Sequence, residues 1–256
     1  MRRRSSWTPW VLPVALLILW QAATQTGLVT NHVLPTLSAV AMAGYRLART
    51  GELFQHIWVS FARAAVGFAI GGAIGFVLGL LNGMSAGAAR VLDSTVQMVR
   101  NIPHLALIPL VILWFGIDEE AKIFLVSFGV FFPIYVNTFH GVRTVDAGLI
   151  EMGRAYGLNR RTLFTQVIFP GALPSILVGV RYALGFTWLT LIVAETISAS
   201  SGIGYMTMNA REFLQTDVVV LGILIYALLG KAADVVTVAL ERYSLAWHPA
   251  FRKVQA

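Results

Sequence analysis

The chain has 256 residues, of which 57% are hydrophobic and 12% are charged, and its mean hydropathy is +0.73. A soluble domain carries about 45–50% apolar and about 25% charged residues, so a soluble enzyme, a disordered chain and a fibrous repeat are excluded. The absence of cysteine excludes disulfide frameworks, thiolate zinc sites and thiol catalysis, and the net charge of +7 raises the question of an anionic partner. The basic residues lie at the ends of apolar runs rather than in one patch, which indicates a membrane and not a nucleic acid as the partner.

Six apolar segments predict an all-α fold, a polytopic membrane protein with six transmembrane helices. The predicted spans are Trp7–Ala23, Trp58–Leu81, Pro103–Ile117, Ile123–Val142, Ala172–Ala194 and Val218–Leu240. The third is short and is expected to begin a turn earlier, near Gln97. The first follows three arginines, as in a signal peptide, but no small-x-small cleavage site comes directly after it, so we expect it to be retained.

The distribution of positive charge predicts the orientation of these spans. With the N-terminus in the cytoplasm, the outer segments hold only Arg46, Arg49, Lys122 and Arg211 of the 19 basic residues. The inner segments hold Arg2, Arg3, Arg4, Arg90, Arg100, Arg143, Arg154, Arg160, Arg161, Arg242, Arg252 and Lys253, and the spans themselves hold Arg63, Arg181 and Lys231. Both termini are therefore expected in the cytoplasm.

Glycine recurs at every fourth position along the second span. The stripe consists of Gly67, Gly71, Gly75, Gly79 and Gly83. In lipid, small residues four apart let helix backbones approach closely. The stripe predicts a tight helix–helix contact, either within the subunit or across a dimer.

Two outer connections are long enough to carry structure. In the outer connecting segment, residues 24–57, apolar residues repeat with a helical period from Leu37 to Leu47, which predicts an amphipathic helix ending near Gly51. A plain spacer is the alternative. Residues 197–217 begin with a Ser/Gly turn cluster and continue with a short helix between Tyr205 and Phe213.

The cytoplasmic connection, residues 143–170, predicts a helix-turn-helix. Asp146 is an expected N-cap, and Gly157 fits a left-handed helix end. Asn159 is expected to cap a second short helix that stops before Pro170. A simple interfacial hairpin that only joins two spans is the alternative.

This connection resembles the coupling motif of bacterial ABC-importer permeases, which reads Glu-Ala-Ala, three residues, Gly, nine residues, Ile-x-Leu-Pro. Glu151, Gly157 and Pro170 match it, whereas Met152 and Gly153 replace the two alanines. Val167 and Phe169 stand for the motif's Ile and Leu. Residues 100–117 and 195–204 resemble the nitrate/sulfonate/taurine branch of the family, and residues 209–217 are most similar to its aliphatic-sulfonate permeases.

The resemblance implies a single permease domain over residues 1–256 in the bacterial cytoplasmic (inner) membrane, importing an aliphatic sulfonate or a related small anion such as taurine. It also implies a homodimer, a cytoplasmic ATPase dimer that binds ATP and Mg, and a periplasmic or extracellular solute-binding protein. Glu151, Gly157 and Pro170 would couple the permease to the ATPase, with Glu151 as the charged contact.

The absence of known cofactor-binding and catalytic motifs leads to the same expectation, that this chain binds no cofactor and is not an enzyme. The phosphate-binding Gly-x-x-x-x-Gly-Lys-[Ser/Thr] loop is absent, and so are zinc-protease and serine-hydrolase motifs. The five histidines never pair four residues apart, so no metal site is expected. A passive channel or secondary transporter, active without an ATPase, remains the alternative function.

Ionisable residues within two spans are the remaining candidates. In the fifth span Arg181, Trp188 and Glu195 are seven residues apart and share a face, which predicts the translocation pathway there. In the sixth span Lys231 and Asp234 are three residues apart, which predicts a structural ion pair in the inner leaflet.

Overall fold

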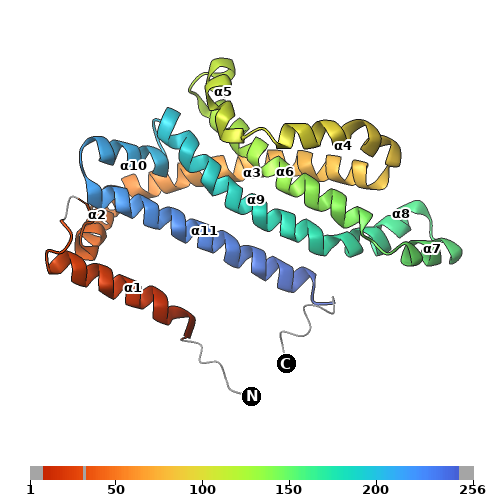
Figure 1. Cartoon of the computed structure of the whole chain (residues 1–256), viewed down its shortest axis with the longest axis horizontal. Helices are drawn as coiled ribbons and strands as arrows, with labels where there is room; N and C mark the ends of the chain where they lie inside the picture. The colour runs from red at the N-terminus through yellow and green to blue at the C-terminus, as the bar shows by residue number, and fades with distance from the viewer. Residues whose placement is uncertain (1–7, 31–32, 248–256) are drawn as a thin grey trace. The chain divides into compact units, whose positions relative to one another are not determined.

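The structure, a computed structural model, describes residues 8–30 and 33–247. Over these ranges the chain consists of helices and turns, without a strand (Figure 1). The chain divides into two compact units, Met1–Val59 with Ser200–Ala227, and Ser60–Ala199 with Leu228–Ala256.

The long helices are α1 (Thr8–Gln25), α3 (Glu52–Met84), α6 (Glu119–Arg143), α9 (Phe169–Ser198) and α11 (Thr216–Ser244). The shorter ones are α2 (Leu37–Thr50), α4 (Ala86–Arg100), α5 (Ile108–Phe115), α7 (Ala147–Ala155), α8 (Arg160–Leu163) and α10 (Ile203–Glu212). A 3₁₀ turn, η1 (His104–Leu107), precedes α5, and a π-helical turn, η2 (Phe164–Ile168), joins α8 to α9.

Four helices among the described residues are long and apolar enough to cross a membrane, namely Glu52–Met84, Glu119–Arg143, Arg160–Ile197 and Thr216–Ser244. They contain the second, fourth, fifth and sixth predicted spans. Each helix is longer than its predicted span because helical hydrogen bonding continues into the polar residues on either side of the apolar segment. The predicted first span is a shorter apolar helix, and its Trp7 lies outside the described residues. The number of six spans therefore stays a prediction.

The third predicted span is broken, so the expected continuous helix from Gln97 is wrong. α4 and the η1–α5 segment meet at an angle of 81°. The break lies at Pro103, which has no N–H to donate and which disfavours helical geometry at Ile102. The apolar run Pro103–Ile117 thus forms only the η1 turn and the eight-residue α5, and the expected extension to Gln97 belongs to the separate helix α4.

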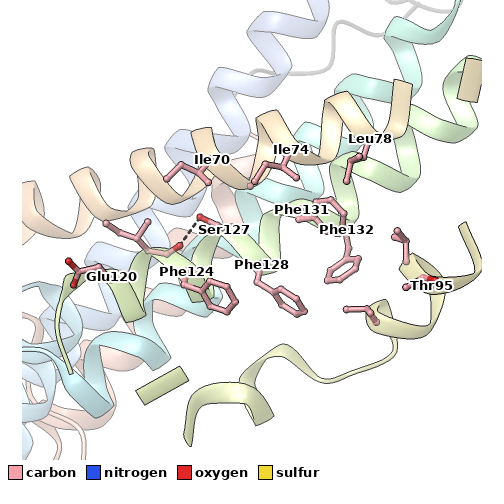
Figure 2. A pocket seen from close by; sticks show the side chains of 14 residues that line it. Ile70, Ile74, Leu78, Thr95, Glu120, Phe124, Ser127, Phe128, Phe131 and Phe132 are labelled. Atoms are coloured by element: carbon pink, nitrogen blue, oxygen red, sulfur yellow. Dashed lines mark hydrogen bonds between the residues drawn. The ribbon is translucent and has the colours of Figure 1, made fainter. Parts of the chain in front are cut away.

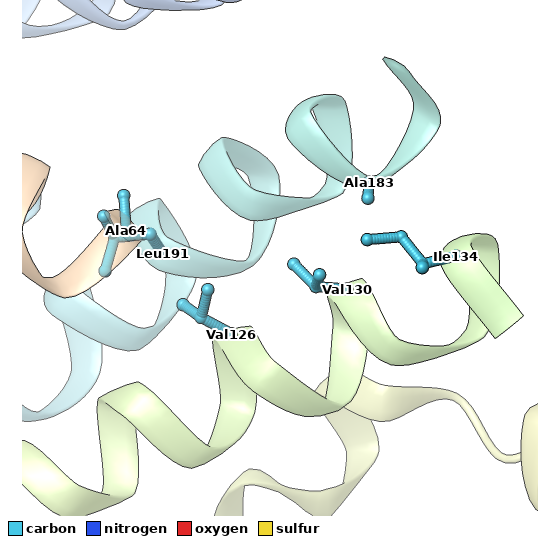
Figure 3. Packing of buried hydrophobic residues seen from close by; sticks show 6 residues of the cluster. All are labelled: Ala64, Val126, Val130, Ile134, Ala183 and Leu191. Carbon is cyan, nitrogen blue, oxygen red and sulfur yellow. The ribbon is translucent and has the colours of Figure 1, made fainter. Parts of the chain in front are cut away.

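In the second unit, α6 and α9 lie side by side over most of their length (Figure 1). Small and branched side chains from α3, α6 and α9 fill the space between them (Figure 3). This core cluster consists of Ala64, Val126, Val130, Ile134, Ala183 and Leu191. Alanine on two of the three helices keeps the backbones close, as expected where packing and not water exclusion holds helices together.

The glycine stripe of α3 lies against α6. A Cβ on Gly71 would collide with the backbone of Ser127, and one on Gly75 would lie 2.5 Å from the carbonyl oxygen of Phe131. Each step of four residues along α3 is matched by a step of four along α6, so the two helices run parallel. The chain must therefore return between the end of α3 and the start of α6, and the α4, η1 and α5 segment makes this connection.

In the first unit, the amphipathic helix predicted in the outer connecting segment is confirmed as α2. Its N-cap is Thr36, whose hydroxyl accepts the Ala39 N–H, and it ends at Gly51 with φ +85°. The short helix predicted between Tyr205 and Phe213 is confirmed as α10.

Candidate functional site

The first half of the connection formed by residues 143–170 is a short helix with a defined start and stop. The Asp146 carboxylate accepts the Gly148 N–H at 2.7 Å at the start of α7. At the end, Gly157 has φ +77°, its N–H donates to Arg154 O, and the Leu158 N–H donates to Gly153 O. These paired bonds form a Schellman motif, which fixes the direction in which the chain leaves α7.

The second half differs from the expected stop before Pro170. Asn159 caps α8 by accepting the Thr162 N–H at 2.9 Å, but α8 continues through the π turn into α9. Pro170 occupies the first turn of α9 instead of ending a helix. The wider turn explains this, because Phe169 N–H bonds five residues back to Phe164 O and so makes room around the proline ring.

The two short helices pack closely, and α7 turns an exposed face outward. Gly153 is buried, and a Cβ there would lie 2.7 Å from the Leu163 methyl group. Leu149, Met152 and Tyr156 are 48%, 50% and 79% exposed. Glu151 is exposed as well, about 100° around the helix from Met152. α7 thus exposes apolar area on one side and a carboxylate on an adjoining side, a composition suited to the docking of a protein.

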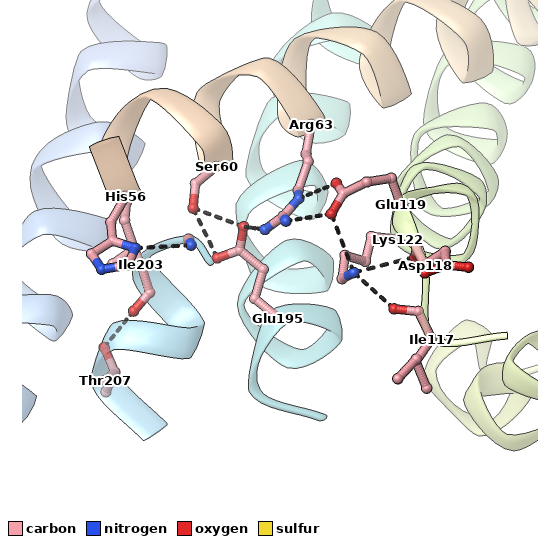
Figure 4. Close-up of polar contacts among 11 residues, drawn as sticks. His56, Ser60, Arg63, Ile117, Asp118, Glu119, Lys122, Glu195, Ile203 and Thr207 are labelled. Carbon is pink, nitrogen blue, oxygen red and sulfur yellow. Dashed lines mark hydrogen bonds and ion pairs between the residues drawn. The ribbon is translucent and has the colours of Figure 1, made fainter. Parts of the chain in front are cut away.

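A buried ion cluster connects α3, α6 and α9 (Figure 4). Arg63 donates from Nη1 to Glu195 Oε1 at 2.8 Å and from Nε to Glu119 Oε2 at 2.6 Å. The Ser60 hydroxyl lies 2.8 Å from both Glu195 oxygens, and Lys122 Nζ donates to Ile117 O at 3.0 Å. Two cations and two carboxylates balance, which offsets the cost of burying Arg63 and Glu195 at 3% and 1% exposure.

Reasoning from the sequence missed this ion cluster. Lys122 was expected in an outer segment, but it lies in the first turn of α6 and is 2% exposed. Arg63 and Glu195 were visible as charges near the ends of two spans, yet they lie 132 residues apart, so no local spacing could join them.

The predicted pathway residues have different surroundings. Arg181 is 42% exposed and its guanidinium donates to Glu241 Oε2 on α11 at 2.6 Å. Trp188 packs against the core cluster, and Glu195 belongs to the buried ion cluster. The three therefore share a helix face but do not line one continuous open surface of the subunit.

Lys231 and Asp234 lie within ion-pair distance, with Nζ 2.9 Å from Oδ2. Their side chains are 68% and 45% exposed in the single chain, so the pair is on its surface. Among residues 8–30 and 33–247, no three His, Asp or Glu side chains are grouped as a metal site would require.

An apolar cavity of about 560 Å³ lies between α3, α4 and α6 (Figure 2). Four phenylalanines of α6 form one wall, and Ile70, Ile74 and Leu78 of α3 form another. The ionisable side chain at its edge is Glu120, and the Ser127 hydroxyl is bonded to Ile123 O at 2.7 Å. Such a surface suits lipid chains or apolar side chains and would repel an anion.

Comparison with known proteins decides the family. Residues 71–243 match the family described as binding-protein-dependent transport system inner membrane component. The chain belongs to this family. It is a permease, a transport component of the membrane and not an enzyme, as predicted from the coupling motif.

Relatives of this permease are similar over nearly its whole length. It is 61% identical over 97% of its length to the aliphatic sulfonates transport permease protein SsuC of Escherichia coli, covering 94% of that protein. It is 44% identical to the corresponding protein of Bacillus subtilis over 98% of this chain and 91% of that one. The taurine transport system permease protein TauC of Escherichia coli is 35% identical, over 93% and 88% of the two chains.

Solved structures share the fold. A chain of the MetNI methionine ABC transporter in an inward-facing conformation matches with a TM-score of 0.61 and 20% identity, over 75% of this permease and 97% of that chain. A chain of an amino acid ABC transporter crystallised with histidines gives a TM-score of 0.65 at 17% identity, over 81% and 99%. The all-helical permease fold is therefore established, as expected from the sequence.

Proposed function

We propose that this permease imports an aliphatic sulfonate, or a related small anion such as taurine, in a complex driven by ATP. The observation that carries the proposal is the 61% identity, over 97% of the chain, to a permease named for aliphatic sulfonates. The greater distance to the taurine permease, at 35% identity, favours the sulfonate as substrate.

The cytoplasmic hairpin of α7 and α8 is proposed as the contact with the ATPase. Its Schellman turn at Gly157 and the buried Gly153–Leu163 contact make it compact. Because α8 continues through η2 and Pro170 into α9, a displacement of the hairpin would move a membrane-spanning helix directly. Glu151 on the exposed face would meet a basic group of the ATPase, which itself holds ATP and Mg.

Two copies of the permease are proposed to pair, with both termini in the cytoplasm and a solute-binding protein on the opposite side. The parallel register of α3 and α6 supports the alternation of spans on which this orientation rests. Reporter fusions at Ser85 and Arg160 should be cytoplasmic, and fusions at Thr50 and Thr207 external. A fusion at Arg160 that reports from outside would contradict the orientation.

The face of α9 that carries Arg181, Trp188 and Glu195 is proposed to border the pathway at its Arg181 end. Arg181 is the exposed member of the three, and Tyr182 beside it is 60% exposed. Glu195, buried in the ion cluster, would hold the helix ends together rather than contact the solute.

Uptake into proteoliposomes tests the function. The permease is reconstituted with its ATPase and binding protein, and radiolabelled ethanesulfonate, taurine and nitrate are compared. ATP-dependent accumulation of ethanesulfonate ahead of the other two is expected. Uptake of equal extent without the ATPase would indicate a channel or secondary transporter and would refute the proposal.

A further inference from the structure

A second cavity, of about 420 Å³, lies beside the break between α4 and η1. We name it the break cavity. Its polar lining consists of Arg100, Asn101, His104, Asn137 and Tyr182. Phe132, Val136 and Phe186 supply much of the apolar remainder. All of these residues belong to the same compact unit, Ser60–Ala199.

The break cavity lies near the middle of the membrane-spanning helices. Gly129 and Asn137, which line it, are about 15 and 27 Å along α6 from Glu119, in a helix about 37 Å long. Non-helical backbone at such a depth is tolerated where it is covered by protein or lines a water-filled cavity. In many secondary transporters, substrate sites form at helices that are interrupted in this way.

Arg100, an exposed residue at the end of α4, gives the break cavity a positive charge. No carboxylate lines the cavity, and within the described residues Arg100 forms no ion pair. The two basic residues within α3 and α9 differ in this respect, because Arg63 is bonded to two carboxylates and Arg181 to one. A guanidinium is suited to a planar pair of acceptor oxygens, as in a carboxylate, phosphate or sulfonate.

His104, which also lines the break cavity, is held in place by α9. His104 Nε2 lies 3.1 Å from the Thr190 hydroxyl, and its ring meets Phe186 edge to face with 5.9 Å between centroids. Gly129 permits this approach, since a Cβ there would lie 3.0 Å from the Thr190 oxygen. The η1 turn is thus positioned against α6 and α9, and the cavity beside it has a defined shape.

We propose that the break cavity is a transient binding site for the transported anion, with Arg100 at the oxyanion and the apolar wall against the short alkyl chain. The proposal rests on the function proposed above and adds a site within the membrane. Arg181 is less suited to this role because Glu241 offsets its charge. No basic side chain is among the residues that line the apolar cavity of Figure 2.

Substitution of Arg100 tests the proposal in the reconstituted complex of permease, ATPase and binding protein. Arg100→Gln should lower ethanesulfonate uptake about tenfold, the effect of losing one charged hydrogen bond. Arg100→Lys, which keeps the charge, should retain most of the uptake. Both variants should still co-purify with the ATPase, because Arg100 is not part of the hairpin of α7 and α8.

The matched control is Arg90→Gln, because Arg90 is exposed on the same helix as Arg100 but lines neither cavity. It should transport like the wild type. If Arg100→Gln also does so while the wild-type complex imports ethanesulfonate, the break-cavity proposal is refuted and the proposed function stands. If the wild-type complex imports no ethanesulfonate, the proposed function itself fails.

A second measurement decides the matter if Arg100→Gln does not assemble. The chain contains no cysteine, so Asn101→Cys introduces its single thiol at the break cavity. Ethanesulfonate should slow modification of this thiol by a cationic methanethiosulfonate, but it should not slow modification of Thr95→Cys in the apolar cavity. Equal rates with and without ethanesulfonate at Asn101→Cys would refute the site.

Discussion

Replacing Gly71 by alanine tests whether the glycine stripe sets the distance between α3 and α6. The added Cβ would collide with three backbone atoms of Ser127, and backbone cannot move aside as a side chain can. To restore ordinary contact distances of about 3.5–4 Å, the two helices must separate by about 1.5–2 Å. The stripe is about 24 Å long, so a local separation also loosens the contacts of the neighbouring glycines.

The expected cost follows from two opposing effects. Overpacking of a well-packed contact costs about 1–3 kcal/mol, and the upper end applies where only backbone can yield. Alanine is favoured over glycine within a helix by up to about 1 kcal/mol, which offsets part of it. Gly71→Ala should therefore destabilise the permease by about 2 kcal/mol.

Two alanine variants provide the controls. At Gly72 a Cβ would lie 3.1 Å from the flexible end of Ile134, and at Gly185 on α9 it would meet nothing within 4 Å. Unfolding of the purified permease by sodium dodecyl sulfate in mixed micelles measures all three. Gly185→Ala should equal or exceed the wild type in stability, and Gly72→Ala should lie between. Wild-type stability of Gly71→Ala would refute the close contact.

Three further substitutions address the ion cluster, the hairpin and the surface pair. Arg63→Met leaves the buried carboxylate of Glu195 uncompensated and should cost about 3–5 kcal/mol in the same unfolding assay; adding Glu195→Gln should recover part of the loss, and no recovery would argue against their pairing. Gly157→Val should abolish co-purification with the ATPase or uncouple transport, because a β-branched residue resists the φ of +77°, whereas Gly157→Asn tolerates it. Normal coupling in the valine variant would show that the turn is dispensable. Exchanging the charges of Lys231 and Asp234 together should restore the expression lost by either single reversal, and a double variant as poor as the singles would exclude pairing as their role.

The sequence alone predicted the features that depend on neighbouring residues. Apolar length located the helices that cross the membrane, because hydrocarbon thickness fixes the number of residues needed. The caps at Asp146 and Asn159 and the left-handed Gly157 were visible because each acts within one turn of helix. The coupling motif around them carried the family assignment for the same reason.

The structural effects of Pro103 and Pro170 were predicted wrongly from the sequence. Pro103 breaks what hydropathy presented as one span, and Pro170 was expected to end a helix that in fact continues. A proline removes one N–H and crowds the preceding turn, but whether the chain bends or widens into a π turn depends on what packs around it. Hydropathy contains no information on that packing.

Only the tertiary structure decided which distant groups meet. The glycine stripe was evident in the sequence, yet its partner could have been any helix of this subunit or of a second copy until α6 was seen against it. Arg63 and Glu195 form an ion pair across 132 residues, and Arg100 faces a cavity whose other walls come from α6 and α9. Such contacts depend on the tertiary structure because a buried charge is costly unless an opposite charge lies next to it, and the partner can come from any part of the chain.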